Sequence, residues 1–380
     1  MSPDSLSNIT AIVLAAFLGL HFLFLRSAQK LAHRFLGAFL LATGISVLGA
    51  ELGGYQLGGE AFPMLLGLID LVNLPPILLL YYAFAVTGSL RQNHQRYRWL
   101  WVLVGLELLL MVLGELLGAV AGNAGWVDAL LELVQLLSLP LGIVILLLML
   151  RTIREHNARL LNQFSDLENK QLRWLRWLAL VNLGFVLIWL VDDVLAALIG
   201  MNDVSGFIAE LSTYATLANV VWMGFAGLRQ PVIYEATPVE ESAEAEAATP
   251  AKPTEPELPA STEGPSQADR EWFEQLRAQI MEQQLYTDPE ATVRSLAAML
   301  NVRPRELSRL INQVDNNNFY HFINALRIQH FKALQADSAN RHLSIVGLAR
   351  EAGFKSKSTF YAAFKKLEGT TPLASGSKHE

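Results

Sequence analysis

The sequence predicts an all-α protein built from a bundle of seven transmembrane helices, a disordered linker and a C-terminal all-helical domain. Three observations carry this prediction. Hydrophobic residues make up 52% of the 380-residue chain and charged residues 17%, a balance typical of membrane proteins. A segment rich in Glu, Pro, Ala and Thr follows residue 229. Beyond it, apolar residues recur at helical spacing in short runs. We therefore expect domains at 1–229, 230–268 and 269–375.

The first domain contains seven apolar stretches, each close to the ~20 residues that a helix needs to cross a bilayer. No Lys or Arg lies inside any of them. The first stretch has no basic residue before it and three after it, so we expect a span there and not a cleaved signal peptide. The seven predicted spans cover residues 8–25, 35–55, 63–87, 99–120, 127–150, 177–199 and 207–228.

The basic residues between these stretches predict the orientation. All 12 of them lie in the loops after the first, third and fifth stretches, and the N-terminus and the other loops hold none. Because Lys and Arg accumulate on the cytoplasmic side, we expect a multi-pass protein of the cell inner (cytoplasmic) membrane. Its N-terminus is then outside and its C-terminus in the cytoplasm, with the lipid bilayer as a partner. The longest cytoplasmic loop, 151–176, is expected to extend the fifth and sixth helices beyond the membrane.

Acidic residues gather in the outer half of the predicted spans, and Glu107 lies near the middle. Carboxylates in a bilayer usually face the bundle interior or a water-filled cavity, and no Lys or Arg in a span neutralises these. They are therefore candidates for sensing an unknown small ligand or cation. The alternative is a structural role, because acids such as Asp128 and Glu210 at helix starts complement the helix dipole. The candidate sensing residues are Glu51, Asp70, Glu115, Asp128, Glu132, Asp192, Asp193 and Glu210.

Motifs of catalysis are absent from the sequence. The chain has no cysteine, which excludes disulfides, thiolate metal sites and cysteine catalysis. It also lacks a P-loop, GxSxG and HExxH. We therefore expect that the protein is not an enzyme and that it has no catalytic residue, no bound metal and no cofactor.

The linker, 230–268, has 8 Asp+Glu against 1 Lys+Arg and almost no large apolar residue after Tyr234. Such a segment buries too little surface to fold, so we expect a flexible tether spanning on the order of 35 Å. A flexible tether transmits torque poorly. We therefore expect a signal to act through dimerisation of the membrane domain, by way of its spans or the 151–176 loop.

The last domain contains one pattern twice. In Ser344–Pro372, a short apolar stripe ends at Gly353 and a second stripe runs from Phe360 to Leu367. In Thr292–Gln313, Asn301 stands at the turn and, like glycine, tolerates a left-handed conformation. Two short helices joined by a tight turn form a helix-turn-helix, whose second helix can enter the major groove of DNA.

The region from about Trp272 to Pro372 resembles the DNA-binding domain of AraC/XylS-type bacterial transcription regulators. The resemblance rests on three motifs in the expected order, LAAMLNVRPRELSRLIN, NFYHFINALRIQHFKAL and SIVGLAREAGFKSKSTFYAAFKKLEGTTP. It implies tandem helix-turn-helix units on one connecting helix. The chain departs from the family at Arg303, where a serine cap is common, at Phe331, where alanine is usual, and at Gln335, where leucine is usual. The loop run NQFSDLENKQLRWLRWL resembles the same loop in membrane-embedded members of this group.

Promoter DNA is the expected partner of the two outward-facing helices. Residues 269–380 carry 15 Lys+Arg and 12 Asp+Glu, a net charge of only +3, so we expect a homodimer when the protein is active. Arg309 and Asn312 are the sharpest candidates for reading bases, because Arg and Asn can bind guanine and adenine bidentately. The candidate DNA-binding residues are Arg305, Ser308, Arg309, Asn312, Lys355, Lys357, Ser358, Tyr361 and Lys365.

These patterns together predict a membrane-bound one-component transcription regulator, controlled by a signal sensed in the membrane domain. Two alternatives belong to other classes. One is a cation transporter or channel with a regulatory C-terminal helical domain, which the in-span acids favour and the lack of an internal repeat among the spans disfavours. The other is a helix-turn-helix pair that binds protein and not DNA.

Overall fold

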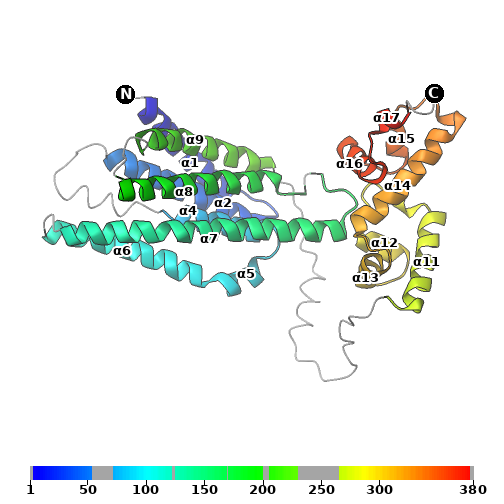
Figure 1. Ribbon diagram of the computed structural model, residues 1–380, viewed down its shortest axis with the longest axis horizontal. Helices are drawn as coiled ribbons and strands as arrows, with labels where there is room; N and C mark the ends of the chain where they lie inside the picture. Colours follow the sequence, from blue (N-terminus) through cyan, green and yellow to red (C-terminus); the bar gives the residue numbers. More distant parts are fainter. Residues whose placement is uncertain are drawn as a thin grey trace, which may run out of the picture. The chain divides into compact units, whose positions relative to one another are not determined.

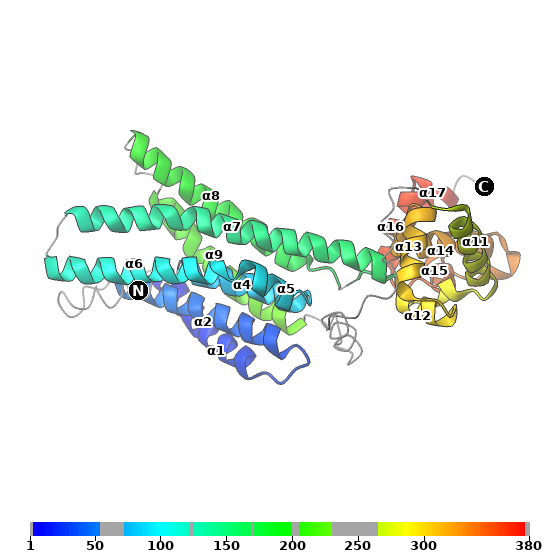
Figure 2. The same cartoon turned by 90° about the horizontal axis from the view of Figure 1, so that it is seen from below.

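The computed structural model describes residues 3–53, 72–121, 125–168, 170–199, 205–229 and 265–376. Regular structure within these ranges is helical, apart from one isolated β-bridge. The chain divides into two compact units, shown in Figures 1 and 2. The first comprises Met1–Arg154 and Leu172–Ala236, and the second Glu155–Gln171 and Thr237–Glu380. The second unit thus includes most of the loop that the sequence assigns to the membrane domain.

The helices of the first unit are long and apolar. In α1 (Pro3–Phe24) and α2 (Lys30–Gly53), small residues meet where the helices cross. A Cβ atom on Gly37 would lie 2.6 Å from the carbonyl oxygen of Gly19, so the backbones approach more closely than larger residues allow, as is common between membrane helices. The remaining helices are α4 (Leu74–Val86), α5 (Leu90–Tyr97), α6 (Trp99–Ala121), α7 (Gly125–Gln163), α8 (Arg173–Ile199) and α9 (Ser205–Arg229).

Several of these helices are suited to a bilayer. Four segments of the described chain are long and apolar enough to cross it, and a fifth if the pair α5 and α6, bent by 54°, counts as one span. Large apolar side chains point outward from them, with Phe24 80% exposed and Trp177 67% exposed, which fits contact with lipid. These helices indicate a membrane protein. Part of the predicted third span, 63–87, lies outside the described residues, and the count of seven stays a prediction. The four segments are Ser5–Phe24, Lys30–Leu52, Gly125–Gln163 and Arg173–Val191.

The C-terminal part of the second unit contains two hydrophobic cores, which share one connecting helix, α14 (Phe319–Ala336). Phe319, Phe322 and Leu326 of this helix belong to the first core. Ile328 and Phe331, further along the helix, belong to the second. The helices around the first core are α11 (Gln267–Glu282), the short 3₁₀ turn η1 (Leu285–Thr287), α12 (Val293–Met299) and α13 (Pro304–Val314). Those around the second are α15 (Ile345–Glu351) and α16 (Lys357–Glu368), preceded by η2 (Ser338–Asn340) and followed by α17 (Pro372–Gly376).

Local sequence signals account for the helix ends. Thr292, Ser344 and Ser356 accept hydrogen bonds from backbone N–H groups at the starts of α12, α15 and α16. The two turns adopt the left-handed conformation that the sequence predicts, with φ of 55° at Asn301 and 96° at Gly353. These short-range features fix the two helix-turn-helix geometries.

The departures from the family pattern have visible structural roles. Arg303 caps α13 without a side-chain hydrogen bond, and Pro304 takes the first helical position instead. Phe331 is fully buried, with its ring centroid 4.8 Å from that of Phe360 and 5.9 Å from that of Phe364. The larger side chain thus fills the second core with aromatic contacts. Gln335 is exposed and faces away from this core.

Candidate nucleic-acid interface

Helix α13 presents one apolar and one polar face. Leu307, Leu310 and Ile311 are fully buried, which turns the opposite face outward. The predicted DNA contacts Arg305, Arg309 and Asn312 are exposed, and Ser308 is partly exposed. The helix therefore offers two guanidinium groups and an amide on one surface, the donors and acceptors that base edges require.

Arg309 is held by two neighbours. It donates from Nη2 to Oδ1 of Asp269 across 2.8 Å and from Nη1 to Oε1 of Gln313 across 3.0 Å. Asp269 is itself fixed, because it forms a capping box with Ser266 at the start of α11. The hydrogen bond from Arg309, followed by that from Ser266, lowers the pKa of Asp269 to about 2. Asp269 was not predicted as a site residue, since nothing in a single sequence marks a partner 40 residues away.

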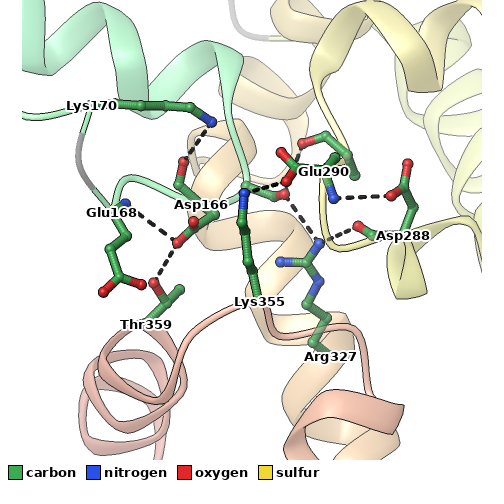
Figure 3. A network of polar contacts seen from close by, with 10 residues as sticks. Asp166, Glu168, Lys170, Asp288, Glu290, Arg327, Lys355 and Thr359 are labelled. Carbon is green, nitrogen blue, oxygen red and sulfur yellow. Dashed lines mark hydrogen bonds and ion pairs between the residues drawn. The ribbon is translucent and has the colours of Figure 1, made fainter. Parts of the chain in front are cut away.

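Helix α16 is organised in the same way. Phe360, Ala363 and Phe364 are buried in the second core. The predicted contacts Lys357, Ser358 and Lys365 are exposed, and Tyr361 is partly exposed. The Lys357 ammonium lies 5.4 Å from the centre of the Tyr361 ring, a cation–π distance. Lys355, just before the helix, is exposed and forms an ion pair with Glu290, drawn in Figure 3.

A buried arginine ties the segment before α12 to the connecting helix. Arg327 of α14 is 0% exposed. It donates from Nε to the carbonyl oxygen of Tyr286 and from Nη2 to that of Asp288, both across 2.7 Å, and from Nη1 to Oδ1 of Asn324 across 3.1 Å. Burial lowers the pKa of Arg327 to about 10, so it stays charged at neutral pH. These bonds tie the segment before α12 to the middle of the connecting helix, and Figure 3 shows the one between Arg327 and Asp288.

The predicted sensing residues are described unevenly. Glu51 accepts a hydrogen bond from Nδ2 of Asn8 across 2.7 Å, which joins α1 to α2. Glu132 on α7 is exposed. Asp70 lies outside the described residues. Glu115, Asp128, Asp192, Asp193 and Glu210 lie on α6, α7, α8 and α9, at positions where the structure describes the backbone and not the side chain. No common site among these acids is therefore shown.

Glu107, near the middle of its predicted span, takes part in a polar contact that the sequence did not reveal. Asn73 is 2% exposed. It donates from Nδ2 to both carboxylate oxygens of Glu107 across 2.9 Å and to the carbonyl oxygen of Ser138 across 3.1 Å. A cavity of about 200 Å³, lined also by Trp101 and Val104, adjoins this pair. Within the described ranges, no group of three or more His, Asp or Glu side chains is placed to hold a metal ion.

Comparison with known families supports one part of the chain. Residues 296–375 match the family model of a helix-turn-helix domain. This range begins in α12 and ends in α17, so it contains α13, α14 and α16. Neither the curated proteins nor the solved structures give a match to the chain. The family match and the geometry of α13 and α16 together identify the C-terminal part as an AraC-type helix-turn-helix DNA-binding domain.

Proposed function

We propose that the protein is a membrane-bound transcription regulator that senses its signal in the membrane unit and binds promoter DNA through both helix-turn-helix units. The observation that carries this proposal is the pairing of α13 and α16 on one connecting helix, each with a buried apolar face. The outward face of α13 exposes Arg and Asn, and that of α16 exposes Lys and Ser. Two such helices can occupy successive major grooves.

The membrane assignment rests on the apolar helices and on the basic residues between them. Because all 12 basic residues of the inter-span loops fall on the side of the C-terminus, the DNA-binding domain lies in the cytoplasm, where DNA is. The signal is a small ligand or cation that acts on the acidic residues of the spans. None of the described features favours the transporter alternative.

DNA binding by the full-length protein in lipid nanodiscs tests this function. Promoter fragments selected from genomic DNA provide the ligand. Arg309→Ala is expected to weaken binding to the selected site by roughly 1–3 kcal/mol and to change the base preferred there. Lys365→Ala is expected to weaken binding to all sequences and to lower the salt slope by about 1.

Arg277→Ala is the matched control, since Arg277 lies on α11 and pairs with Glu274 across 3.8 Å. It should bind DNA as the wild type does. The function proposed here is wrong if the wild-type protein, correctly folded in nanodiscs, selects no sequence at low salt.

A further inference from the structure

A short segment of the loop between α7 and α8 lies in the DNA-binding part of the second unit. Phe164 forms an antiparallel β-bridge with Thr292, at the start of α12. Next to it, Ser165 donates two hydrogen bonds to the carbonyl oxygen of Ala291, from its backbone N across 3.2 Å and from Oγ across 2.7 Å. These contacts join residues more than 120 positions apart in sequence, so they are a tertiary interaction and not a local turn.

The connecting helix holds the same serine from the other side. Asn324 donates from Nδ2 to the carbonyl oxygen of Ser165 across 3.0 Å, and Arg327 donates from Nη2 to its Oγ across 3.1 Å. Ser165 and Asn324 are each 1% exposed. Every polar atom of Ser165 therefore has a partner in the DNA-binding domain, and removing this segment would uncover buried polar groups.

The next residue reaches the second helix-turn-helix unit. Oδ1 of Asp166 accepts a hydrogen bond from Oγ1 of Thr359 across 2.6 Å, in the first turn of α16. Asp166 is 4% exposed. Lys170 closes the segment by donating to the carbonyl oxygen of Asp166 across 3.3 Å and placing its ammonium 4.1 Å from the centre of the Phe164 ring. Figure 3 shows Asp166 between Lys170 and Thr359.

We propose that Phe164, Ser165 and Asp166 form a docking segment, which binds across both helix-turn-helix units and holds the DNA-binding domain in a state of low DNA affinity. This inference rests on the proposed function and assigns it a means of control. The docking site consists of the carbonyl of Ala291, Asn324 and Arg327 of α14, and Thr359 of α16.

The negative charge of Asp166 in the docking segment disfavours DNA binding near the start of α16. The N-terminal end of a helix attracts phosphate, and in helix-turn-helix proteins it is the end of the recognition helix that faces the bases. The carboxylate of Asp166 accepts a hydrogen bond from Thr359 in the first turn of α16, close to the positive end of the helix dipole. Glu290 pairs with Lys355, a predicted DNA contact, but both residues belong to the DNA-binding domain itself and their pair does not depend on docking. The docked carboxylate of Asp166 therefore disfavours a DNA phosphate near the first turn of α16.

The chain connectivity explains how a signal could reach this site. The docking segment directly follows α7 at Gln163 and precedes α8 at Arg173, and each of these helices contains a candidate membrane span. A change at the cytoplasmic ends of the two helices therefore acts on the docking segment within about ten residues. The signal then has to favour the undocked state over the docked one, which is a shift between two populations. This route does not depend on the linker or on torque passing through it.

A disulfide across the bridge tests the docking. Because the natural chain has no cysteine, Phe164→Cys with Thr292→Cys introduces the only two thiols. Paired residues of antiparallel strands have Cα atoms ~4.5–5.5 Å apart, which is within disulfide range. The full-length double variant is placed in nanodiscs, and DNA binding is measured with the same sample oxidised and then reduced.

We expect an intrachain disulfide to form without DNA, and the oxidised protein to bind promoter DNA at least ten-fold more weakly than the reduced protein. Single-cysteine variants control for the loss of the Phe164 ring and the Thr292 cap. The docking model is overturned if no intrachain disulfide forms, if the bond forms between chains, or if oxidation leaves DNA affinity unchanged or raises it. A reduced protein that binds no DNA at all contradicts the proposed function instead.

A second pair of variants separates the Asp166 contact from a general loss of acidic charge. Asp166→Ala removes the acceptor for Thr359 and is expected to raise DNA affinity at least three-fold and to make a promoter reporter independent of the signal. Glu168→Gln removes a neighbouring charge from an exposed side chain and should leave both properties near wild type. Equal effects of the two variants, or no effect of Asp166→Ala, overturn a specific role for the docked carboxylate.

Discussion

Arg309 of α13 donates a hydrogen bond to Asp269 of α11 across 2.8 Å, so the arginine best placed to read a base already has a fixed carboxylate partner. The pair constrains the guanidinium plane, while each terminal nitrogen keeps a second N–H for another acceptor. Bidentate recognition of guanine depends on the orientation of that plane. Asp269 therefore acts as a positioning residue for Arg309.

Asp269→Asn is expected to keep the helix cap and lose this orientation. Discrimination at the base that Arg309 reads should fall by about 1 kcal/mol, part of the ~1–3 kcal/mol of a bidentate contact. Affinity for non-specific DNA should stay the same or rise, because a negative charge is removed. Binding to a panel of single-base operator variants measures both quantities. Glu274→Gln, an acid on the same helix that pairs with Arg277, is the control. Unchanged discrimination in Asp269→Asn contradicts a positioning role.

The same pair predicts a pH dependence. The folded-state pKa of Asp269 is lowered to about 2, below the value of about 3.9 expected in an unfolded chain. A group with a lowered folded pKa stabilises the fold above its unfolded pKa, and this contribution disappears as the pH falls through its folded pKa. The difference in thermal stability between wild type and Asp269→Asn should thus be constant from about pH 5 to pH 8 and shrink between about pH 4 and pH 2. A difference that increases on acidification contradicts the assignment.

Gly353 is expected to be intolerant of any side chain. Its φ is +96°, and a Cβ atom there would lie 2.6 Å from the Cα atom of Thr287 in η1. Gly353→Ala should destabilise the domain by at least the ~1–3 kcal/mol of a strained backbone. Gly347→Ala is the matched control, because its nearest neighbour atom would be 3.4 Å away and alanine favours a helix by up to about 1 kcal/mol. Thermal unfolding compares the two, and equal stability would show that the turn is adaptable.

The membrane topology gives a further prediction. A reporter that is active only in the cytoplasm should work when fused after Arg229 and fail when inserted near Gly59. The loops on the Arg229 side of the membrane hold the basic residues that mark the cytoplasmic side, and the loops on the Gly59 side hold none. Expression levels measured by immunoblot control for unstable fusions. The reverse pattern would place the DNA-binding domain away from DNA and contradict the proposed function.

Features set by near neighbours in sequence were predictable. Asn301, Gly353 and Ser356 have the left-handed turns and the cap that their residue types favour, and the buried stripes of α13 and α16 follow helical periodicity. Contacts between distant residues were not. Ser165 and Asp166 are short polar residues in a loop, and neither periodicity nor composition indicates that Ala291 and Thr359 are their partners. Asn73 and Glu107 are separated by 34 residues, and their pairing depends on how two helices pack.

Chromatin immunoprecipitation of the intact protein from cells tests directly whether it binds promoter DNA while it is in the membrane. Wild type is compared with the double variant Arg309→Ala and Lys365→Ala, with both confirmed in the membrane fraction. With the wild type, we expect discrete enrichment of promoter fragments that share a common sequence; with the double variant, we expect this enrichment to be lost. A wild-type protein that is present in the membrane under inducing conditions, yet enriches no discrete DNA site, would contradict it.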